Sequence, residues 1–135
     1  MIDAFIISPG RTASSSIYYS LNEIGDLQLP LNKEPHYFID LKDKKKKNKI
    51  LNNLNINNYQ DYKKIYKKSC YKIDASTGYF YYIDEFIKNL KKKKINPKII
   101  FLIREPISRS KSLYIHQIKN ENENELSFEK CLKRK

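Results

Sequence analysis

A short apolar run followed by a loop of small and hydroxyl-bearing residues places the strongest constraint on how this chain folds. Residues 4–7 read Ala-Phe-Ile-Ile, and residues 8–16 read Ser-Pro-Gly-Arg-Thr-Ala-Ser-Ser-Ser. An apolar stripe of helical spacing follows at Ile17, Leu21 and Ile24. The run predicts a buried strand and the stripe predicts an amphipathic helix. The segment therefore indicates the first strand-to-helix unit of an α/β fold.

The loop in this unit is suited to bind an anion. The first turn of a helix has unpaired backbone N–H groups and the positive end of the helix dipole, so an anion gains hydrogen bonds and charge compensation there. Gly10 and Ala13 allow a close approach to the backbone, and Arg11 supplies a cationic fork. Three further hydroxyls either bond phosphate oxygens or cap the helix: those of Ser14, Ser15 and Ser16. An ordinary capped turn has the same composition, so both interpretations stay open at this point.

The alternation of strand and helix patterns recurs later in the chain. Residues 71–74 predict a short strand, followed by a turn over 75–78 and a helix. The apolar face of that helix is expected to comprise Phe80, Ile83, Ile87 and Leu90. Residues 98–103, Lys-Ile-Ile-Phe-Leu-Ile, predict a strand buried on both faces. Repeated units of this kind predict a parallel, doubly wound α/β sheet flanked by helices, in one domain spanning residues 1–135.

Other segments give weaker signals. Pro106 suits the first turn of a helix that is expected to run to about Gln117. The apolar side of this helix is expected to comprise Ile107, Tyr114 and Ile118. Residues 126–132 predict the opening of another helix. Residues 33–38 contain a proline and predict an extended loop or edge strand, followed by two Lys/Asn/Tyr-rich helices up to Lys68.

The charge balance identifies a class of partner without choosing within it. Lysine and arginine exceed the acids by 27 to 15, which gives a formal net charge of +12. Such a chain attracts nucleic acid, acidic lipid, sulfated sugar or a nucleotide. Much of the charge lies in basic runs at 44–47, 91–94 and 133–135, which are expected to be solvated helix ends and loops.

The cysteines and the N-terminus predict a cytoplasmic protein with no metal site. Cys70 and Cys131 are far apart and lack the spacing of metal ligands, so they are expected to be reduced thiols. Met1 lies only a few residues before the first expected strand, which leaves no room for a targeting peptide. The chain also has no long apolar segment, so no membrane anchor is expected.

The predicted topology brings separate segments to one crevice. In an open α/β sheet, ligands bind at the carboxyl ends of the strands, which places Arg11, Ser76 and Arg104 near one another. Ser76 is also expected to cap the helix that follows it. Ser108 and Ser112 lie one helical turn apart after Arg104, so an arginine and a helix hydroxyl are expected to grip a second anion. Two such sites favour a doubly phosphorylated nucleotide.

Four segments, in this order, carry a family resemblance. They are Pro-Gly-Arg-Thr-Ala-Ser-Ser at 9–15, Lys-Glu-Pro-His-Tyr-Phe at 33–38, Asp-Ala-Ser-Thr-Gly-Tyr at 74–79, and Arg-Glu-Pro-Ile-Ser-Arg-Ser-Lys-Ser-Leu-Tyr at 104–114. Together they resemble the sulfotransferases that use 3′-phosphoadenosine 5′-phosphosulfate (PAPS). The likeness is greatest to the carbohydrate branch, which includes the heparan sulfate enzymes and their bacterial relatives.

The resemblance implies a nucleotide-binding fold of the P-loop type, with PAPS as sulfate donor and no metal ion. The 5′-phosphosulfate group is expected to bind the first loop, at Arg11, Thr12, Ala13, Ser14, Ser15 and Ser16. Arg104 and Ser112 are expected to bind the 3′-phosphate.

The resemblance also implies catalytic roles. Glu34 falls where the carbohydrate branch has its catalytic base, and His36 where it has a neighbouring histidine. Sulfuryl transfer needs an in-line nucleophile, a group that takes its proton, and positive charge on the leaving phosphate. Glu34 is expected to accept the proton, His36 to support it, and Arg11 to stabilise the leaving group. Without this context, Glu34 reads equally well as a surface carboxylate paired with Lys33.

Two departures from the family pattern affect the expected activity. Ala75 stands where some glycan sulfotransferases carry a lysine, so one positive charge is missing. The family also continues beyond the equivalent of residues 126–129 with further strands and helices. The resemblance therefore implies that residues 1–135 form the N-terminal portion of a fold truncated at its C-terminus.

Three functions remain open from the sequence. The first is PAPS-dependent sulfation of a hydroxyl or amine, with a carbohydrate as the expected acceptor. The second is a truncated, non-catalytic nucleotide-binding remnant. The third is a basic nucleic-acid-binding module, although no recognition motif supports specific nucleic-acid binding. A nucleotide kinase is disfavoured because the loop lacks a Gly-Lys-Ser/Thr ending. The acceptor and the oligomeric state are left open.

Overall fold

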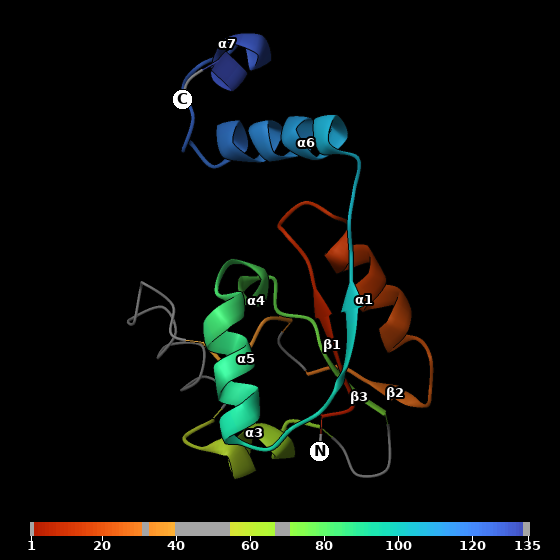
Figure 1. Ribbon diagram of the computed structural model, residues 1–135. Coiled ribbons are helices and arrows are strands. Elements are labelled where there is room, and N and C mark those ends of the chain that lie inside the picture. The colour runs from red at the N-terminus through yellow and green to blue at the C-terminus, as the bar shows by residue number, and fades with distance from the viewer. Residues whose placement is uncertain (1, 31–32, 40–54, 67–70, 134–135) are drawn as a thin grey trace.

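The computed structural model describes residues 2–30, 33–39, 55–66 and 71–133 of the 135-residue chain. Within these residues lies a four-stranded sheet in the order β2-β3-β1-β4, in which every pair of neighbours is parallel (Figure 1). The strands are β1 (Ala4–Ile7), β2 (Leu27–Gln28), β3 (Tyr71–Asp74) and β4 (Lys98–Phe101). The predicted parallel sheet is confirmed. β2 was not predicted, because two residues are too few to show a periodicity.

The register of the sheet aligns the ends of its strands. Ala4 lies opposite both Ile73 of β3 and Lys98 of β4, and Ile7 lies opposite Phe101. Because the strands are parallel, the loops that follow β1, β3 and β4 leave the same edge of the sheet. A ligand site at this edge draws on all three loops.

Helices cover both faces of β1, as the doubly wound prediction requires. Phe5 and Ile7 belong to an apolar cluster with Phe86 of α5 (Ile83–Lys92) and Tyr79 of α4 (Gly78–Tyr81). The alternate residues of β1 belong to a second cluster, against α1 (Ser14–Asn22). Figure 1 shows α1 on one side of the sheet and α5 on the other. This alternation follows from the two-residue repeat of a strand.

The large cluster is rich in aromatic rings. The Phe5 ring has its centroid 5.4 Å from that of Phe38 and 5.0 Å from that of Phe86, both edge to face. Tyr62, on α3 (Tyr59–Lys64), is fully buried and stacks on Tyr37. This packing fixes residues 37–38 and therefore the end of the segment that carries Glu34.

Two helix predictions need correction. Ile24 was expected on the apolar stripe of the first helix, but α1 ends at Asn22 and Ile24 is exposed, whereas Tyr18 is buried. The helix expected through Phe80 and Leu90 is two helices, α4 and α5, separated at Tyr82 (φ −125°, ψ 42°).

The expected apolar face of the second helix also shifts. Phe86 and Leu90 are its buried residues, while Ile83 and Ile87 are exposed. The break at residue 82 rotates α5 relative to α4, so a single periodicity does not describe both.

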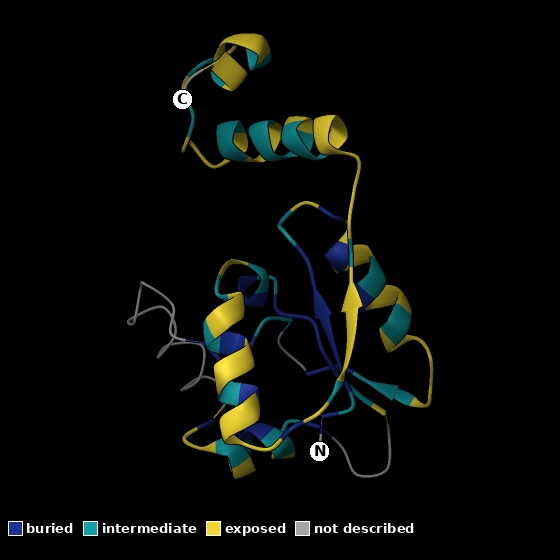
Figure 2. Cartoon of the chain, in the orientation of Figure 1, coloured by how far each residue is buried: buried dark blue, intermediate teal, exposed yellow. Residues whose placement is uncertain are grey.

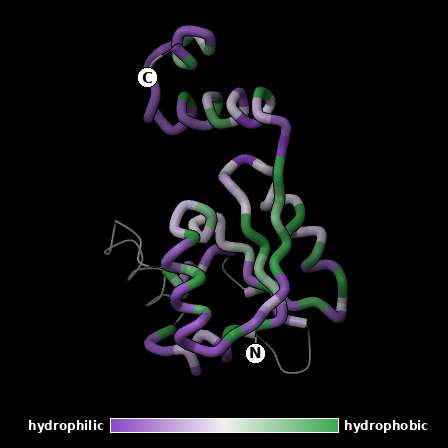
Figure 3. Tube along the Cα trace, viewed as in Figure 1, coloured by the Kyte–Doolittle hydropathy of each residue, from purple (hydrophilic) through white to green (hydrophobic). Residues whose placement is uncertain are grey.

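The prediction that residues 98–103 are buried on both faces is wrong. Every residue of β4 is exposed (Figure 2). The reason is the strand order: β4 lies at the end of the sheet, and no described element pairs with its outer side. The apolar character of the strand is visible in Figure 3.

The last two helices lie beyond the carboxyl ends of β1 and β4, apart from the main body (Figure 1). α6 (Pro106–Lys119) begins at the predicted proline, and α7 (Phe128–Lys133) confirms the predicted final helix. Neither contains a buried residue. The Glu105 carboxylate caps α6 by accepting hydrogen bonds from the backbone N–H groups of Ile107 and Ser108, at 2.8 and 2.6 Å.

Some predictions fall outside the described residues. α3 confirms one of the two helices expected before Lys68. The other, with the lysine run at 44–47, and Cys70 lie in undescribed segments. Among the residues that are described, no helix has the length and apolar character needed to span a membrane.

Candidate active site

The loop between β1 and α1 has an unusual backbone. Arg11 and Ala13 both adopt left-handed conformations, with φ of 71° and 66°. Each costs about 1–2 kcal/mol in an L-residue. Such strained positions are concentrated in ligand-binding loops. The Thr12 hydroxyl stabilises the bend by donating to the Pro9 carbonyl at 3.0 Å.

The first turn of α1 has no side-chain cap. Ala13 is its N-cap residue and has no side chain that accepts a hydrogen bond, so serine capping is not observed at this position. The N–H groups of the first helical turn therefore have no capping side chain, which is the arrangement that favours an anionic ligand.

A pocket of about 280 Å³ opens at this helix end. Its lining is the predicted donor-binding set without Thr12, namely Arg11, Ala13, Ser14, Ser15, Ser16, Arg104 and Ser112. Thr12 is buried beneath the loop, where it supports the backbone instead of lining the pocket.

Residues far apart in the chain meet around this pocket. The Arg11 Nε donates to Ser112 Oγ of α6 at 3.2 Å, across 101 residues of sequence. The Arg104 guanidinium donates to the Arg11 carbonyl at 3.3 Å, and that of Arg109 donates to the Gly10 carbonyl at 3.4 Å. These contacts hold the start of α6 against the loop.

A second pocket, of about 360 Å³, shares three residues with the first. It is lined by Arg11, Arg104, Ser108, Lys111, Ser112 and Ile115. Three of these residues are cationic and none is acidic. The two adjoining pockets therefore offer positive charge and hydroxyl donors to a ligand with two anionic groups.

Glu34 lies in a dense cluster of polar contacts. Its Oε1 is 3.2 Å from the Lys33 ammonium, and its Oε2 is 3.2 Å from His36 Nε2. The Thr77 hydroxyl donates to the same Oε2 at 2.9 Å. Burial raises the pKa of the Glu34 carboxyl, but the hydrogen bonds from His36 and Thr77 and the charge of Lys33 outweigh it, so the pKa lies below its ordinary value. The Glu34 carboxyl is therefore ionised at neutral pH.

Lys33 links this carboxylate to the anion-binding loop. Its ammonium donates to Ser15 Oγ at 2.9 Å and to Ser14 Oγ at 3.3 Å, in addition to the contact with Glu34. One side chain thus spans the predicted base and the predicted donor loop. Ala75, where the expected positive charge is absent, is buried in the apolar cluster that contains Ile6 and Ile73.

His36 is held rigidly in a supporting position. Its backbone is left-handed, with φ of 51°, and its N–H donates to the Ser76 hydroxyl at 3.2 Å. The ring packs on Gly78, where an added Cβ would lie 2.7 Å from Nδ1. Glycine at residue 78 is therefore required for the ring to reach Glu34.

Ser76 does not act as predicted. It is fully buried and lines neither pocket described above, and instead of capping α4 it donates to Asp74 at 2.7 Å. Asp74 is also fully buried and accepts hydrogen bonds from Tyr62 and Tyr79. Burial raises the pKa of this carboxyl. The network anchors the backbone of His36 to β3.

Several site residues were missed from the sequence. Thr77 holds Glu34, and the Tyr81 hydroxyl accepts a hydrogen bond from Gly10 N–H at 3.2 Å. Lys33 was expected only as a surface partner of Glu34, and no role was predicted for Thr77, Tyr81 or Arg109. Lys33, Thr77 and Arg109 lie inside the second, third and fourth motif segments, and this position was the sequence signal that could have pointed to them. Tyr81 lies outside the motif segments, so no signal pointed to it.

The described residues contain no group of three or more His, Cys, Asp or Glu side chains placed to hold a metal ion. The fold and site together define a parallel α/β protein with a crevice lined by basic and hydroxyl side chains at the carboxyl edge of its sheet. No family model matches the chain, and no curated protein matches it.

The structure is similar to the crystal structure of a sulfotransferase from Alicyclobacillus acidocaldarius, with a TM-score of 0.70 and 20% sequence identity. The match covers 96% of this chain and 55% of that sulfotransferase. The fold is therefore of the sulfotransferase type, and the chain spans just over half the length of its structural neighbour.

Proposed function

We propose that this chain binds PAPS and transfers its sulfuryl group to a hydroxyl or amine acceptor. The observation that carries the proposal is the Lys33 bridge, which connects an ionised carboxylate at Glu34 to the hydroxyls of Ser14 and Ser15 in the anion-binding loop. Sulfuryl transfer requires a proton acceptor and an anion-binding loop close enough for one acceptor hydroxyl to contact the base while its oxygen faces the sulfur. The sulfotransferase fold is consistent with this chemistry.

The donor would occupy both pockets. The 5′-phosphosulfate group would lie at the first turn of α1, against Arg11, and the 3′-phosphate would lie against Arg104 and Ser112. Arg11 contacts Ser112 directly, so the two subsites are coupled through one hydrogen bond. Ser108 and Lys111 line the second pocket and add donors for the 3′-phosphate.

The reacting groups follow from this placement. The acceptor oxygen attacks the sulfur, the bond from sulfur to the bridging phosphate oxygen breaks, and adenosine 3′,5′-bisphosphate leaves. Glu34 takes the proton of the acceptor hydroxyl. Lys33 and Arg11 neutralise the charge on the sulfuryl oxygens and on the leaving phosphate. His36 and Thr77 orient the carboxylate.

A sugar is the acceptor that best suits the surface beside Glu34. Thr77 and Tyr81 are four residues apart and lie on one face of the α4 turn. Thr77 holds Glu34, and Tyr81 is held at the phosphate loop by Gly10 while 60% of it remains exposed. An exposed aromatic ring one turn from Thr77, the residue that holds the proposed base, offers a flat apolar surface to the C–H face of a pyranose.

Binding of adenosine 3′,5′-bisphosphate tests the donor site. We expect Arg104→Ala to weaken binding at least about tenfold, because a charge-assisted hydrogen bond contributes about 1.5–3 kcal/mol. Isothermal titration calorimetry measures the loss, and Lys119→Ala, at the far end of α6, is the matched control. Equal affinity of the two variants would contradict the proposed 3′-phosphate site.

Sulfate transfer from labelled PAPS to a panel of glycans tests the reaction. We expect Glu34→Gln to retain bisphosphate binding and to lose transfer at least about a hundredfold, because general-base catalysis contributes about 10²–10⁴ in rate. Bisphosphate binding without transfer by the unaltered chain would favour the second candidate, a non-catalytic nucleotide-binding protein.

A further inference from the structure

The His36 ring is oriented without a hydrogen bond to its second nitrogen. Nε2 lies 3.2 Å from Glu34 Oε2, whereas Nδ1 is buried and has no hydrogen-bond partner among the described residues. The orientation of a functional histidine is commonly set by the hydrogen bond that its other nitrogen makes. At His36 the backbone and the packing on Gly78 must therefore set the orientation of the ring.

The backbone of His36 has a conformation that needs support. Its φ of 51° is left-handed, which is strained in an L-residue. Such a conformation persists only where the surrounding structure over-determines it. The N–H of His36 donates to the Ser76 hydroxyl at 3.2 Å, across 40 residues of sequence. This hydrogen bond therefore helps to decide where the ring lies.

Ser76 is itself held by Asp74. The Ser76 hydroxyl donates to Asp74 Oδ1 at 2.7 Å, while the same oxygen accepts the hydrogen bond from His36. A carboxylate acceptor polarises the hydroxyl, and successive hydrogen bonds in a buried chain strengthen one another. The contacts thus run without a gap from Asp74 through Ser76 and His36 to Glu34.

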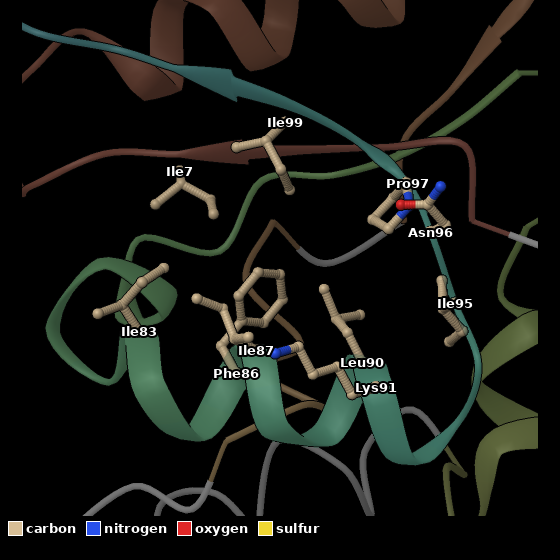
Figure 4. Close-up of a pocket in the computed structure, with 10 residues that line it drawn as sticks. All are labelled: Ile7, Ile83, Phe86, Ile87, Leu90, Lys91, Ile95, Asn96, Pro97 and Ile99. Carbon is tan, nitrogen blue, oxygen red and sulfur yellow. The ribbon is translucent and has the colours of Figure 1, made fainter.

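The carboxylate of Asp74 is fixed by three elements. Asp74 lies at the end of β3, opposite Phe5 of β1, and is fully buried. Its Oδ2 accepts hydrogen bonds from the hydroxyls of Tyr62 on α3 and Tyr79 on α4. The Tyr79 ring stacks on Phe86, whose ring lies between α5 and the sheet (Figure 4). Asp74 is therefore a rigid anchor for Ser76.

Packing alone does not explain a carboxylate at residue 74. No lysine or arginine of the described segments forms an ion pair with Asp74. Burial raises the pKa of this carboxyl although three hydroxyls donate to it, so the donors offset the cost of burying the charge only in part. An amide of the same shape would bond these hydroxyls without that cost. The charge is better explained by its action on Ser76.

We propose that Asp74 is a positioning residue for Glu34 and acts through the Ser76 hydroxyl and the backbone of His36. This chain of contacts holds the His36 ring where Nε2 meets the Glu34 carboxylate. Asp74 lines neither of the two basic pockets, so it contacts neither the donor nor the acceptor. The inference rests on the proposed role of Glu34 as the base, but its first test requires no sulfate transfer.

Titration of the Glu34 side-chain carbon by ¹³C NMR is that test. The hydrogen bond from His36 lowers the pKa of the Glu34 carboxyl, so Asp74→Asn should raise this pKa by displacing the ring. Loss of a nearby negative charge acts in the opposite direction, so a rise reports the hydrogen bond. Ser76→Ala changes no charge and should raise the pKa equally, and the double variant should raise it no further.

Tyr62→Phe is the matched control. It removes a donor from Oδ2 of Asp74 and leaves the contact between Oδ1 and Ser76. This variant should lower the stability of the fold without changing the Glu34 titration. Denaturant unfolding establishes that each variant is folded under the conditions of the titration. If Asp74→Asn does not fold, Ser76→Ala interrupts the same chain of contacts and takes its place.

The kinetics of sulfate transfer are the second test. Asp74→Asn should lower kcat at least about tenfold, because the base is misaligned, and should leave the Kd of adenosine 3′,5′-bisphosphate within about twofold. An unchanged Glu34 titration in Asp74→Asn, or an equal rise in Tyr62→Phe, would overturn the inference. Absence of transfer by the unaltered chain would contradict the proposed function alone, since the titration decides the positioning role by itself.

Discussion

The ionised carboxylate of Glu34 depends on its immediate partners. Burial alone would raise the pKa of this group and keep it protonated over a wider range of pH. Two hydrogen-bond donors and the ammonium of Lys33 reverse that direction. The same lysine contacts Ser15, so it also places the carboxylate next to the loop. Substitutions of the residues that contact Glu34 should therefore change the pKa of its carboxyl while the fold stays intact.

Lys33→Met should raise the pKa of the Glu34 carboxyl, because it removes the adjacent positive charge while keeping the length of the side chain. Titration of the Glu34 side-chain carbon by ¹³C NMR measures the change. Lys33→Arg keeps the charge and should retain the lowered pKa. An unchanged Glu34 titration in Lys33→Met would contradict the bridging role.

The lowered pKa of Glu34 also predicts how stability depends on pH. The folded pKa is below the ordinary value of 4.5, so the contribution is present above that value. It should be lost as pH falls through the folded pKa. Denaturant unfolding at a series of pH values should therefore show a smaller decrease below pH 4.5 for Glu34→Gln than for the unaltered chain.

Gly78→Ala should displace the His36 ring. The new Cβ would lie 2.7 Å from His36 Nδ1 and 3.0 Å from Ile39 Cδ1, so the surrounding groups must move. We expect a loss of about 1–3 kcal/mol in the free energy of unfolding, as for other overpacked sites. Gly25→Ala is the control, because nothing lies within 4 Å of its added Cβ. Equal stability of the two variants would show that His36 adapts freely.

At the scale of secondary structure, the site is assembled from the ends of elements. The loop after β1, the turn after β3 and the start of α6 contribute side chains at the same edge of the sheet. The loop after β1 and the turn after β3 are positioned by strands that contain buried residues. α6, in contrast, contains no buried residue. α6 depends on its cap at Glu105 and on hydrogen bonds to the loop.

Glu105→Ala should therefore loosen the start of α6 more than any core element. Its carboxylate accepts from Ile107 N–H and Ser108 N–H, and both donors lose their partner in the variant. We expect faster amide exchange at these two residues with little change in β1. Glu105→Asp, which retains an oxygen acceptor, should restore part of the protection. Unchanged exchange at residue 107 would show that the cap is dispensable.

At the scale of the molecule, the positive charge acts in two ways: as the net charge of the whole chain and as cationic side chains at defined positions. A net charge of +12 attracts any polyanion through a field that salt screens, whereas the two pockets concentrate Arg11, Arg104 and Lys111 at defined positions. The two pockets are the basis on which we propose a nucleotide, and not nucleic acid, as the ligand.

Salt should separate these two contributions. Raising sodium chloride from about 0.05 M to about 0.5 M should remove at least about a hundredfold of any affinity for random duplex DNA, which depends on released counterions. Bisphosphate binding should fall by about tenfold or less, because its hydrogen bonds persist when long-range charge is screened. Parallel titrations by fluorescence anisotropy and calorimetry measure both. A steeper salt dependence for the bisphosphate would contradict a built nucleotide site.

The sequence alone determined the features that depend on residues close together in the chain. Apolar runs and helical spacing predicted β1, β3, β4 and the start of α6, and their alternation predicted a parallel sheet. The sequence also placed the loops after β1, β3 and β4 at one edge, because loops after parallel strands leave the same end of a sheet. That the residues gathered there bind a sulfate donor stays a prediction.

Only the tertiary structure decided features that depend on neighbours distant in the chain. The apolar run of β4 specified a strand but not its place in the sheet, since strand order is set by how the units pack. The buried role of Ser76 follows from the Asp74 network, and the meeting of Arg11 with Ser112 crosses 101 residues. Lys33 acquired its second partner, Ser15, only when the chain folded, because a lysine side chain carries no sequence signal for what it will reach.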